Sequence, residues 1–523
     1  MQPPFEYGSQ RLTSGIALKI ARGTLAGVIT PAVASRVQAS YNHVKQIAAG
    51  EQAVYGINTG FGPLCTTRVS ATDLTRLQSN ILKSHAVGVG KPLEAEVVKL
   101  MIILKIHALA QGYSGIALAT LERMQWLVEN EVLPLVPSQG SVGASGDLAP
   151  LSHLFLPLIG LGMVTFEGKT VEAKEVLAKF GLQPIELSPK EGLALINGTQ
   201  FIAAHAVKVV ERLHTLMMCA DITGAMMIEG LKASVKPFTQ VLHELRPFPA
   251  NQYVAGSIRQ LLQGSEILAS HAGCARVQDP YSLRCIPQVH GASITSWLHL
   301  KEAVEIELNS VTDNPVIIDR ANTISGGNFH GQPLALPIDY ACLAASEIGN
   351  ISDRRVYLAL EGDTPGVPKL LMKETGTNSG FMIVQYTSAA LASENKGLCF
   401  PASADSIPTS LGQEDHVSMG SIGARKALRV IENTERIVGI ELMCAAQAMD
   451  YHRPLQSGKI MEAVHAHVRS KIPHIEEDQL MSGFLEAAVE MVRNGELPKI
   501  VQSVAAQEQI DFEIPHVSIY EEY

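Results

Sequence analysis

The placement of proline constrains the fold of this chain more than any other feature of its sequence. Four long stretches contain no proline: residues 201–236, 288–314, 338–364 and 409–453. Because proline breaks the interior of an α-helix, these stretches leave room for unusually long helices. In the last stretch, apolar residues recur at steps of three, four and seven, a pattern typical of an amphipathic helix: Leu428, Ile431, Val438, Leu442, Ala445 and Met449.

The rest of the pattern also favours helices. Residues 97–110 are apolar nearly all round, as expected of a helix in the middle of a bundle. Strand signals are sparse, and the clearest predicts a hairpin around Glu167-Gly168. We therefore expect a mainly α-helical chain with a long central bundle and a smaller amino-terminal part. The least arbitrary division separates residues 1–200 from residues 201–523.

Composition narrows the class of protein. A chain of 523 residues is long enough for about two to four domains. Hydrophobic residues make up 46% and charged residues 18%, which indicates a well-packed globule whose surface is partly covered by identical subunits. The net charge of −10 includes no cluster of Lys and Arg, so no nucleic-acid partner is expected. The most apolar stretch, residues 148–164, contains two prolines and falls short of the roughly 20 apolar residues of a membrane span.

The cysteines and histidines do not predict a metal site. Seven cysteines are scattered and never spaced as CxxC: Cys65, Cys219, Cys274, Cys285, Cys342, Cys399 and Cys444. This pattern argues against a disulfide framework and indicates a reducing compartment. The first ten residues lack the features of a secretory signal, so we expect a cytoplasmic protein. A metallo-hydrolase is not expected, because there is no HExxH motif and because His465 and His467, two residues apart, would not share a helical face.

The stretch GSVGASGDLAPLSH, at residues 140–153, is unusual because residues 143–146 carry no bulky side chain. One interpretation is a flexible turn capped by Asp147 at the start of a helix. The other is a backbone bent so tightly that one amide nitrogen attacks the carbonyl two residues earlier. Glycine suits the attacking position, because it has no Cβ to block the approach.

In the second interpretation, the nitrogen of Gly146 attacks the carbonyl of Ala144. Ser145 lies between them and carries a hydroxyl that can leave as water. The product would be a ring with an exocyclic methylidene group. Such an electrophile is made from the chain itself, without an imported cofactor.

The string GASGDLAPLSH resembles the cyclising motif of the ammonia-lyase and aminomutase family that builds 4-methylidene-imidazol-5-one (MIO). Further family motifs follow in order, from VYGINTGFG at residues 54–62 to EDHVSM at residues 414–419. The resemblance implies an enzyme in which Ala144, Ser145 and Gly146 form MIO, with no metal or nucleotide. It also implies that Asp147 orients or polarises the cyclising backbone. The expected assembly is a homotetramer whose active sites draw residues from three subunits.

Removal of ammonia from an α-amino acid needs a base for the β-proton and a cation for the carboxylate. The electrophile captures either the amino nitrogen or the aromatic ring of the substrate, and the sequence does not choose between them. By resemblance, Tyr55 is the expected base, and Tyr281 competes for part of the proton handling. Arg284 is expected to bind the carboxylate as a planar, bidentate donor. Gln278 should line the site with Tyr281.

Two further residues are assigned by the resemblance alone. Asn197, in INGTQ, is expected to hydrogen-bond the carbonyl region of the MIO ring and to stabilise negative charge there. Phe329, in GGNFHGQP, matches a residue that packs near the ring and is linked to its formation.

His85 and Glu414 bear on the choice of substrate. Ser84-His85 stands at the family's selectivity position, where histidine-acting members and some tyrosine-acting members read Ser-His. His85 would then hydrogen-bond an imidazole. Aromatic-specific members usually lack a glutamate at the position of Glu414. A carboxylate can pair with an imidazole, whereas beside a phenyl ring it would stay unpaired, at a cost of about 1–3 kcal/mol or more.

We therefore expect a histidine-acting enzyme that converts L-histidine to trans-urocanate and ammonia. A tyrosine or phenylalanine lyase, or an aminomutase, is the alternative on the same scaffold, and a non-catalytic helical scaffold is a remote one. Leu411-Gly412 departs from the Ala-Asn that histidine-acting members often have before QEDH. This departure concerns the shape of the loop that carries Glu414.

Overall fold

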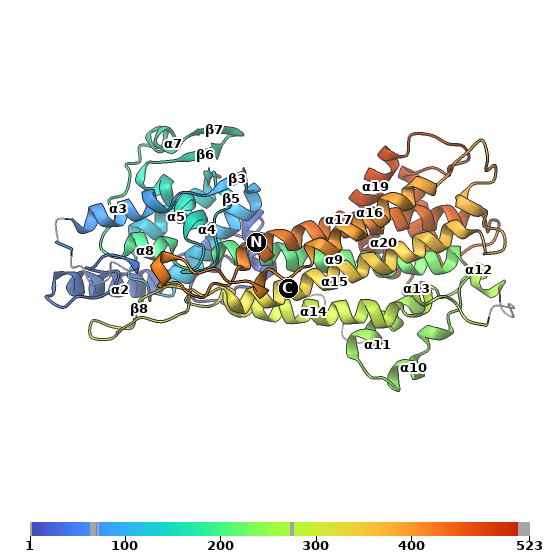
Figure 1. Cartoon of the computed structure of the whole chain (residues 1–523), viewed down its shortest axis with the longest axis horizontal. Coiled ribbons are helices and arrows are strands. Elements are labelled where there is room, and N and C mark those ends of the chain that lie inside the picture. Colours follow the sequence, from blue (N-terminus) through green and yellow to red (C-terminus); the bar gives the residue numbers. More distant parts are fainter. Residues whose placement is uncertain (1–2, 63–68, 71–72, 272–276, 511–522) are drawn as a thin grey trace.

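The computed structural model describes residues 3–62, 69–70, 73–271, 277–510 and 523. Figure 1 shows a long helical bundle attached at one end to a smaller part built from the amino-terminal residues. The prediction of a mainly α-helical chain with this arrangement is confirmed.

Of the seven cysteines, Cys65 and Cys274 lie outside the described residues, and the five others are free thiols. No helix within the described ranges is long and apolar enough to cross a membrane.

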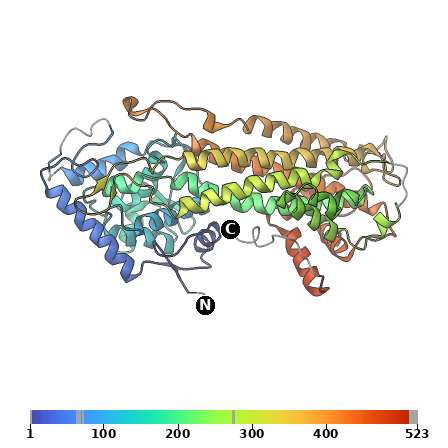
Figure 2. The ribbon, with the colours of Figure 1, turned by 90° about the horizontal axis from the view of Figure 1, so that it is seen from below.

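Four long helices form the bundle, and each lies largely within one of the proline-free stretches: α9 (Gln200–Gly230), α14 (Ile286–Leu308), α15 (Gln332–Glu361) and α17 (Gly420–Asp450). Helix α17 packs along α9 and α15, and α14 packs along α15 and α9. Figure 2 shows these helices running along the long axis of the molecule. Helix α15 begins before its proline-free stretch and contains Pro337. That proline removes one backbone hydrogen bond near the start of the helix, and the helix continues past it.

The predicted buried faces are confirmed. Residues 97–110 are all buried within α4 (Ala95–Ala110), which packs against α9. Five residues of the apolar stripe on α17 are buried, and Leu428 is partly buried. One apolar cluster extends from the amino-terminal part through the bundle. The division at residue 200 therefore coincides with the start of α9 but with no break in the core, and it stays a prediction.

Short helices and small sheets surround α4 in the amino-terminal part. The helices are α1 (Ser14–Ala21), α2 (Pro31–Ala49), α3 (Leu74–His85), α5 (Leu118–Glu129), α6 (Leu148–Phe155), α7 (Ala173–Lys179) and α8 (Glu191–Ile196). Strands β1 (Phe5–Glu6) and β2 (Gly27–Val28) pair in parallel. The antiparallel pairs are β3 (Val89–Pro92) with β5 (Pro137–Gln139), β4 (Leu133–Pro134) with β6 (Met163–Phe166), β6 with β7 (Lys169–Glu172), and β8 (Val316–Ile317) with β9 (Thr323–Ile324).

The hairpin predicted around Glu167-Gly168 is the β6–β7 pair. Its two-residue loop has positive φ at both Glu167 and Gly168, at 49° and 74°. Two positive φ angles are the requirement of a type I′ turn, the common turn of short hairpins.

The remaining helices lie along the bundle and around its far end (Figure 1). They are α10 (Gln240–Glu244), α11 (Pro249–Leu261), α12 (Glu266–Ala269), α13 (Tyr281–Arg284), α16 (Met382–Leu398), α18 (Lys459–Lys471), α19 (Ser482–Arg493) and α20 (Glu496–Gln507). The near end of the bundle is where three of the sequence motifs converge. Asn197, Phe329 and Glu414 each lie a few residues before the first residue of a long helix, α9, α15 and α17 respectively.

Candidate active site

A cavity of about 1020 Å³ lies where the near end of the bundle meets the amino-terminal part. Seven of the predicted site residues line it: Tyr55, His85, Ala144, Ser145, Asn197, Phe329 and Glu414. Gly146 lines a smaller pocket of about 240 Å³, which shares His85, Ala144 and Glu414 with the large cavity. The structure therefore brings together residues from six separate motifs of the sequence.

The Ala144–Gly146 segment turns sharply over Ser145. The backbones of Ala144 and Gly146 pair with each other across that residue, and Gly146 also pairs with Gly198. The φ angle of Gly146 is 79°, and a Cβ added there would lie 2.1 Å from the carbonyl oxygen of Gly198. A side chain at position 146 would therefore meet both an unfavourable backbone conformation and a backbone atom. The packing of this turn therefore requires the small residue that the sequence has at position 146.

Asp147 is fully buried next to this turn. Its Oδ2 accepts hydrogen bonds from the backbone N–H groups of Phe201 and Ile202, at 3.1 and 3.0 Å, and its Oδ1 accepts one from Ser141 Oγ at 3.0 Å. Burial raises the pKa of Asp147 to about 7, although these hydrogen bonds act in the opposite direction. The side chain makes no capping bond to α6, the helix it precedes. The simple capping interpretation is therefore wrong: Asp147 binds the first turn of α9 and fixes the turn to the bundle.

Asn197 connects the end of α8 to the same turn. Its Nδ2 donates to the carbonyl oxygen of Ser145 at 2.8 Å, and the backbone N–H of Asp147 donates to the carbonyl of Gly198 at 2.7 Å. Asn197 Oδ1 is buried and has no hydrogen-bond partner among the described atoms. Two hydrogen bonds thus attach the Asn197–Gly198 segment to the Ser145–Asp147 segment.

Glu414 contacts Ser145, although the two residues are 269 positions apart in the sequence. Ser145 Oγ donates to Glu414 Oε1 at 2.5 Å. Glu414 Oε2 accepts from Thr409 Oγ1 at 2.8 Å and from Ser410 Oγ at 3.0 Å. The carboxylate is therefore held in the cavity by hydroxyl groups, and no cation is bonded to it among the described residues.

His85 lies at the end of α3 and lines the same cavity. Its Nδ1 is 2.9 Å from Ser84 Oγ. Burial lowers the pKa of His85, although the backbone of Ile81 and the nearby Glu414 carboxylate act in the opposite direction. Leu411, which departs from the family pattern, lines the cavity and is 96% exposed. Glu414 contacts Ser145 in the presence of this departure.

Tyr55 and Phe329 also line the cavity. The hydroxyl of Tyr55 accepts a hydrogen bond from the backbone N–H of Gly62 at 3.4 Å. Phe329 lies in the loop before α15, next to His330. His330 Nε2 is 3.2 Å from the carbonyl oxygen of His416, and the two imidazole rings stack with their centroids 5.7 Å apart. These contacts join the loop of Phe329 to the loop of Glu414.

Gln278, Tyr281 and Arg284 are brought together with each other but not with the cavity. Arg284 Nη2 donates to Gln278 Oε1 at 3.0 Å, and the guanidinium lies over the ring of Tyr281, 4.6 Å from its centroid. These residues lie on and before α13, near the far end of the bundle in Figure 1, whereas α8 lies at the other end. Tyr281 is 71% exposed. Within one chain the two groups of predicted site residues are therefore separate.

Lys105 is a residue at this site that the sequence motifs did not single out. Its Nζ donates to the carbonyl oxygen of Asn197 at 2.5 Å. The available signal is a lysine inside the apolar run of residues 97–110, where a buried charge needs a partner.

No group of three or more His, Cys, Asp or Glu side chains is placed to hold a metal ion in the part of the chain that the structure describes.

The family model for aromatic amino acid lyases matches residues 12–470 of this chain. The chain belongs to this family. The prediction of an enzyme of the lyase class is thereby confirmed, as is the resemblance found in the cyclising motif.

Individual relatives support this membership. The histidine ammonia-lyase of Myxococcus xanthus (strain DK1622) is 45% identical over 490 residues, which cover 94% of this chain and 96% of that protein. The solved structure of histidine ammonia-lyase from Trypanosoma cruzi has 38% identity and a TM-score of 0.89, and covers 99% of this chain and 97% of its own. Tyrosine aminomutase from Streptomyces globisporus has 32% identity and a TM-score of 0.90, and covers 96% and 99% respectively. Because both structures fit equally well, the fold alone does not distinguish their substrates.

Proposed function

We propose that this protein removes ammonia from L-histidine and releases trans-urocanate. The observation that carries the proposal is the position of the Glu414 carboxylate, which shares one cavity with His85 and contacts Ser145. A carboxylate and an imidazole together offer hydrogen-bond partners to the side chain of histidine, and they offer none to a phenyl ring. The 45% identity to a histidine ammonia-lyase supports the same assignment.

We further propose that Ala144, Ser145 and Gly146 cyclise to MIO. The residues fit the group, because the backbone turns sharply over Ser145 and because position 146 has no room for a Cβ. Asn197 Nδ2 would hold the carbonyl oxygen of Ser145 in the ring, as it holds that oxygen in the linear chain. When present, MIO supplies an electrophile that helps the amino group of the substrate to leave.

The side chains around the turn are proposed to perform the other steps. Tyr55 takes the β-proton of the substrate, since it lines the same cavity as Ser145. Glu414 and His85 hold the imidazole, and Phe329 packs beside the turn and excludes water. Asn197 donates to oxygen atoms that gain negative charge during the reaction.

The carboxylate of the substrate requires a cation, and we propose that Arg284 of another subunit supplies it, with Gln278 and Tyr281. In one chain these residues lie at the far end of the bundle from the cavity. A homotetramer whose active sites combine residues of three subunits would bring them together. Tyr281 would then share part of the proton handling with Tyr55.

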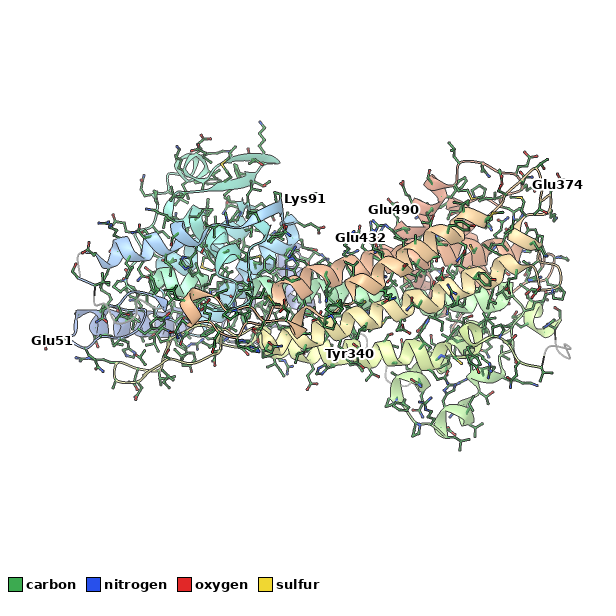
Figure 3. All side chains as sticks on the ribbon, viewed as in Figure 1. Glu51, Lys91, Tyr340, Glu374, Glu432 and Glu490 are labelled. Atoms are coloured by element: carbon green, nitrogen blue, oxygen red, sulfur yellow. The ribbon has the colours of Figure 1, made fainter. Side chains whose placement is uncertain are left out.

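Exposed apolar side chains on the flank of the bundle support an assembly of this kind. They include Leu336, Tyr340 and Leu343 on α15 and Ile383 and Tyr386 on α16. Figure 3 labels Tyr340 on this flank. Large exposed apolar surfaces on long helices are typical of contacts between subunits. The buried free thiols Cys219, Cys342, Cys399 and Cys444 agree with a cytoplasmic location, which we also propose.

A substrate panel tests the proposed function. The purified protein is incubated separately with L-histidine, L-tyrosine and L-phenylalanine, and the products are separated and identified. We expect ammonia and trans-urocanate from histidine, with far slower turnover of the other two amino acids. The structural similarity to a tyrosine aminomutase makes the second candidate a tyrosine-acting enzyme. Faster turnover of tyrosine than of histidine would establish that candidate, and a β-amino acid as the main product would establish a mutase.

A further inference from the structure

Lys105 is a charged residue in the middle of the apolar helix α4. Only 1% of its surface is exposed, and its neighbours on the same helix are almost all apolar. Burial of an ammonium group is costly unless the group is paired or hydrogen-bonded. The contacts that compensate for the burial of Lys105 therefore indicate what this side chain does.

The contacts of Lys105 all concern one short segment. Nζ donates to the carbonyl oxygen of Asn197 at 2.5 Å and to Gln200 Oε1 at 3.5 Å. Gln200 Nε2 in turn donates to Thr312 Oγ1 at 2.9 Å. Lys105 thus holds the backbone of the turn between α8 and α9, and Gln200 fixes that turn from its other end.

This turn is in direct contact with the segment that cyclises. Asn197 Nδ2 donates to the Ser145 carbonyl, and the Gly198 carbonyl accepts from the N–H of Asp147. A Cβ at Gly146 would lie 2.1 Å from the Gly198 oxygen. With the two backbones this close, a displacement of Asn197–Gly198 changes the position of Ser145–Gly146.

The charges around Lys105 belong to two buried acids and one buried base. Asp313 and Asp147 favour the charged amine, and Lys190, which pairs with Asp313 Oδ2 at 2.6 Å, disfavours it. Burial lowers the pKa of Lys105 to about 7. The amine therefore depends on its hydrogen-bond acceptors, because none of these carboxylates is bonded to it among the described contacts.

We propose that Lys105 is a positioning residue for ring formation, which holds the Asn197–Gly198 turn against Ser145–Asp147 while the ring closes. This inference rests on the cyclisation proposed above. In that reaction the nitrogen of Gly146 forms a bond to the carbonyl carbon of Ala144. The Ala144 oxygen leaves as water with the hydrogen of the Gly146 nitrogen and that of the Ser145 nitrogen. The Ser145 hydroxyl leaves as a second water with the Ser145 α-hydrogen, which creates the methylidene double bond.

The geometry explains why a buried ammonium is suited to this role. The bond from Lys105 fixes the Asn197 carbonyl and thereby aims the amide side chain of Asn197 at the Ser145 carbonyl. A small displacement of a catalytic group costs rate, because the reacting atoms must be close and aligned. The expected consequence of losing Lys105 is slow ring formation in a chain that still folds.

The test follows ring formation directly. The full chain is made by cell-free translation, the reaction is stopped at intervals, and intact mass spectrometry measures the fraction that has lost two water molecules. Lys105→Met keeps the length of the side chain and removes its donors. We expect it to form the ring about 10- to 100-fold more slowly than the unaltered protein, a typical effect of removing a residue that supports a contacting group. Lys105→Arg keeps the charge and should be faster than Lys105→Met.

Lys99→Met is the matched control. Lys99 is also a buried lysine of α4, with 6% exposure, but it pairs with Glu131, and neither side chain bonds to the ring-forming turn among the described contacts. Ring formation in Lys99→Met should match that of the unaltered protein. A normal rate in Lys105→Met, or an equal loss in both variants, would overturn the positioning role.

Two further measurements keep the inference testable. If Lys105→Met is insoluble, Lys105→Arg is compared with Lys105→Gln, and equal rates would overturn the proposal. If Lys105 acts through Asn197, its loss should matter less once the Asn197 side chain is gone. The rate of ring formation in the double variant Lys105→Met/Asn197→Ala should therefore fall by less than the product of the two single-variant factors. A fall equal to that product would contradict the proposed role. An unaltered protein that never loses water would instead refute the cyclisation itself.

Discussion

The hydroxyl of Ser145 donates to Glu414 Oε1 at 2.5 Å. In the linear chain, the carboxylate assigned to the substrate is therefore occupied by the group that cyclisation removes. Loss of that hydroxyl as water leaves Oε1 available, while Thr409 and Ser410 continue to hold Oε2. The same event that would create the electrophile would also open the carboxylate to the imidazole of a substrate.

The first prediction concerns Glu414. Glu414→Gln removes the negative charge but keeps the size of the side chain, so kcat/KM for histidine should fall by about 10- to 100-fold, as expected for loss of a charged hydrogen-bond acceptor. Turnover of phenylalanine, however slow, should not fall in parallel. Glu432→Gln, at a partly exposed residue of α17 that pairs with Arg436 and is labelled in Figure 3, serves as the control. Equal losses with both amino acids would show that Glu414 does not select the substrate.

The second prediction concerns Gly146. Gly146→Ala should form no ring, because its φ is 79° and its Cβ would lie 2.1 Å from the Gly198 oxygen. Gly168→Ala is the matched control, since Gly168 has a similar φ of 74° and no atom within 4 Å of the added Cβ. The control should lose about 1–2 kcal/mol from backbone strain and keep the ring. Intact mass and thermal unfolding measure the two effects, and a fully cyclised Gly146→Ala protein would contradict this explanation of the turn.

The third prediction concerns stability in acid. His107 accepts a hydrogen bond at Nδ1 from the backbone N–H of Gly8, at 3.1 Å, and burial lowers its pKa from 6.5 to about 4. Between these two pH values the unfolded chain binds more protons than the folded one, so the free energy of unfolding decreases as the pH falls. The contribution of this one residue is about 3 kcal/mol.

Urea unfolding at several pH values between 7 and 4 measures this contribution. His107→Gln should be less stable at pH 7, because glutamine does not reproduce the contacts of the ring, but its stability should depend less steeply on pH. Parallel pH dependences in the two proteins would assign the acid sensitivity to other residues.

The fourth prediction concerns the sharing of sites between subunits. Ser145→Ala lacks the electrophile, and Arg284→Ala lacks the proposed cation, so each protein alone should be inactive. When the two variants are co-expressed, mixed tetramers should contain some sites with both an intact Ser145 and an intact Arg284, and activity should return. Mixtures that stay inactive, despite mixed assembly shown by native mass spectrometry, would refute the shared site.

The sequence predicted those features that depend on local rules. Proline-free stretches located the long helices, and the run of small residues located a turn in which Gly146 has no room for a side chain. Both follow from constraints that the backbone imposes within a few residues. The family motifs then named seven residues that the folded chain gathers round one cavity.

The remaining features depend on contacts between distant segments. Asp147 precedes α6 in the sequence, but its carboxylate binds the first turn of α9, which local capping patterns do not reveal. In the sequence, Lys105 is a polar residue in a largely apolar helix. Its contact with the turn at Asn197 depends on how the fold packs that turn against the helix. The position of Arg284 at the far end of the bundle likewise follows from the lengths and packing of the helices.

Intact mass spectrometry of the purified, active protein is the most direct measurement of the central claim, with peptide mapping to locate any modification. We predict a mass lower than that of the translated sequence by two water molecules, located at residues 144–146, and no such deficit in an inactive but folded Ser145→Ala variant. A fully active protein with the unmodified mass would contradict the proposed cyclisation.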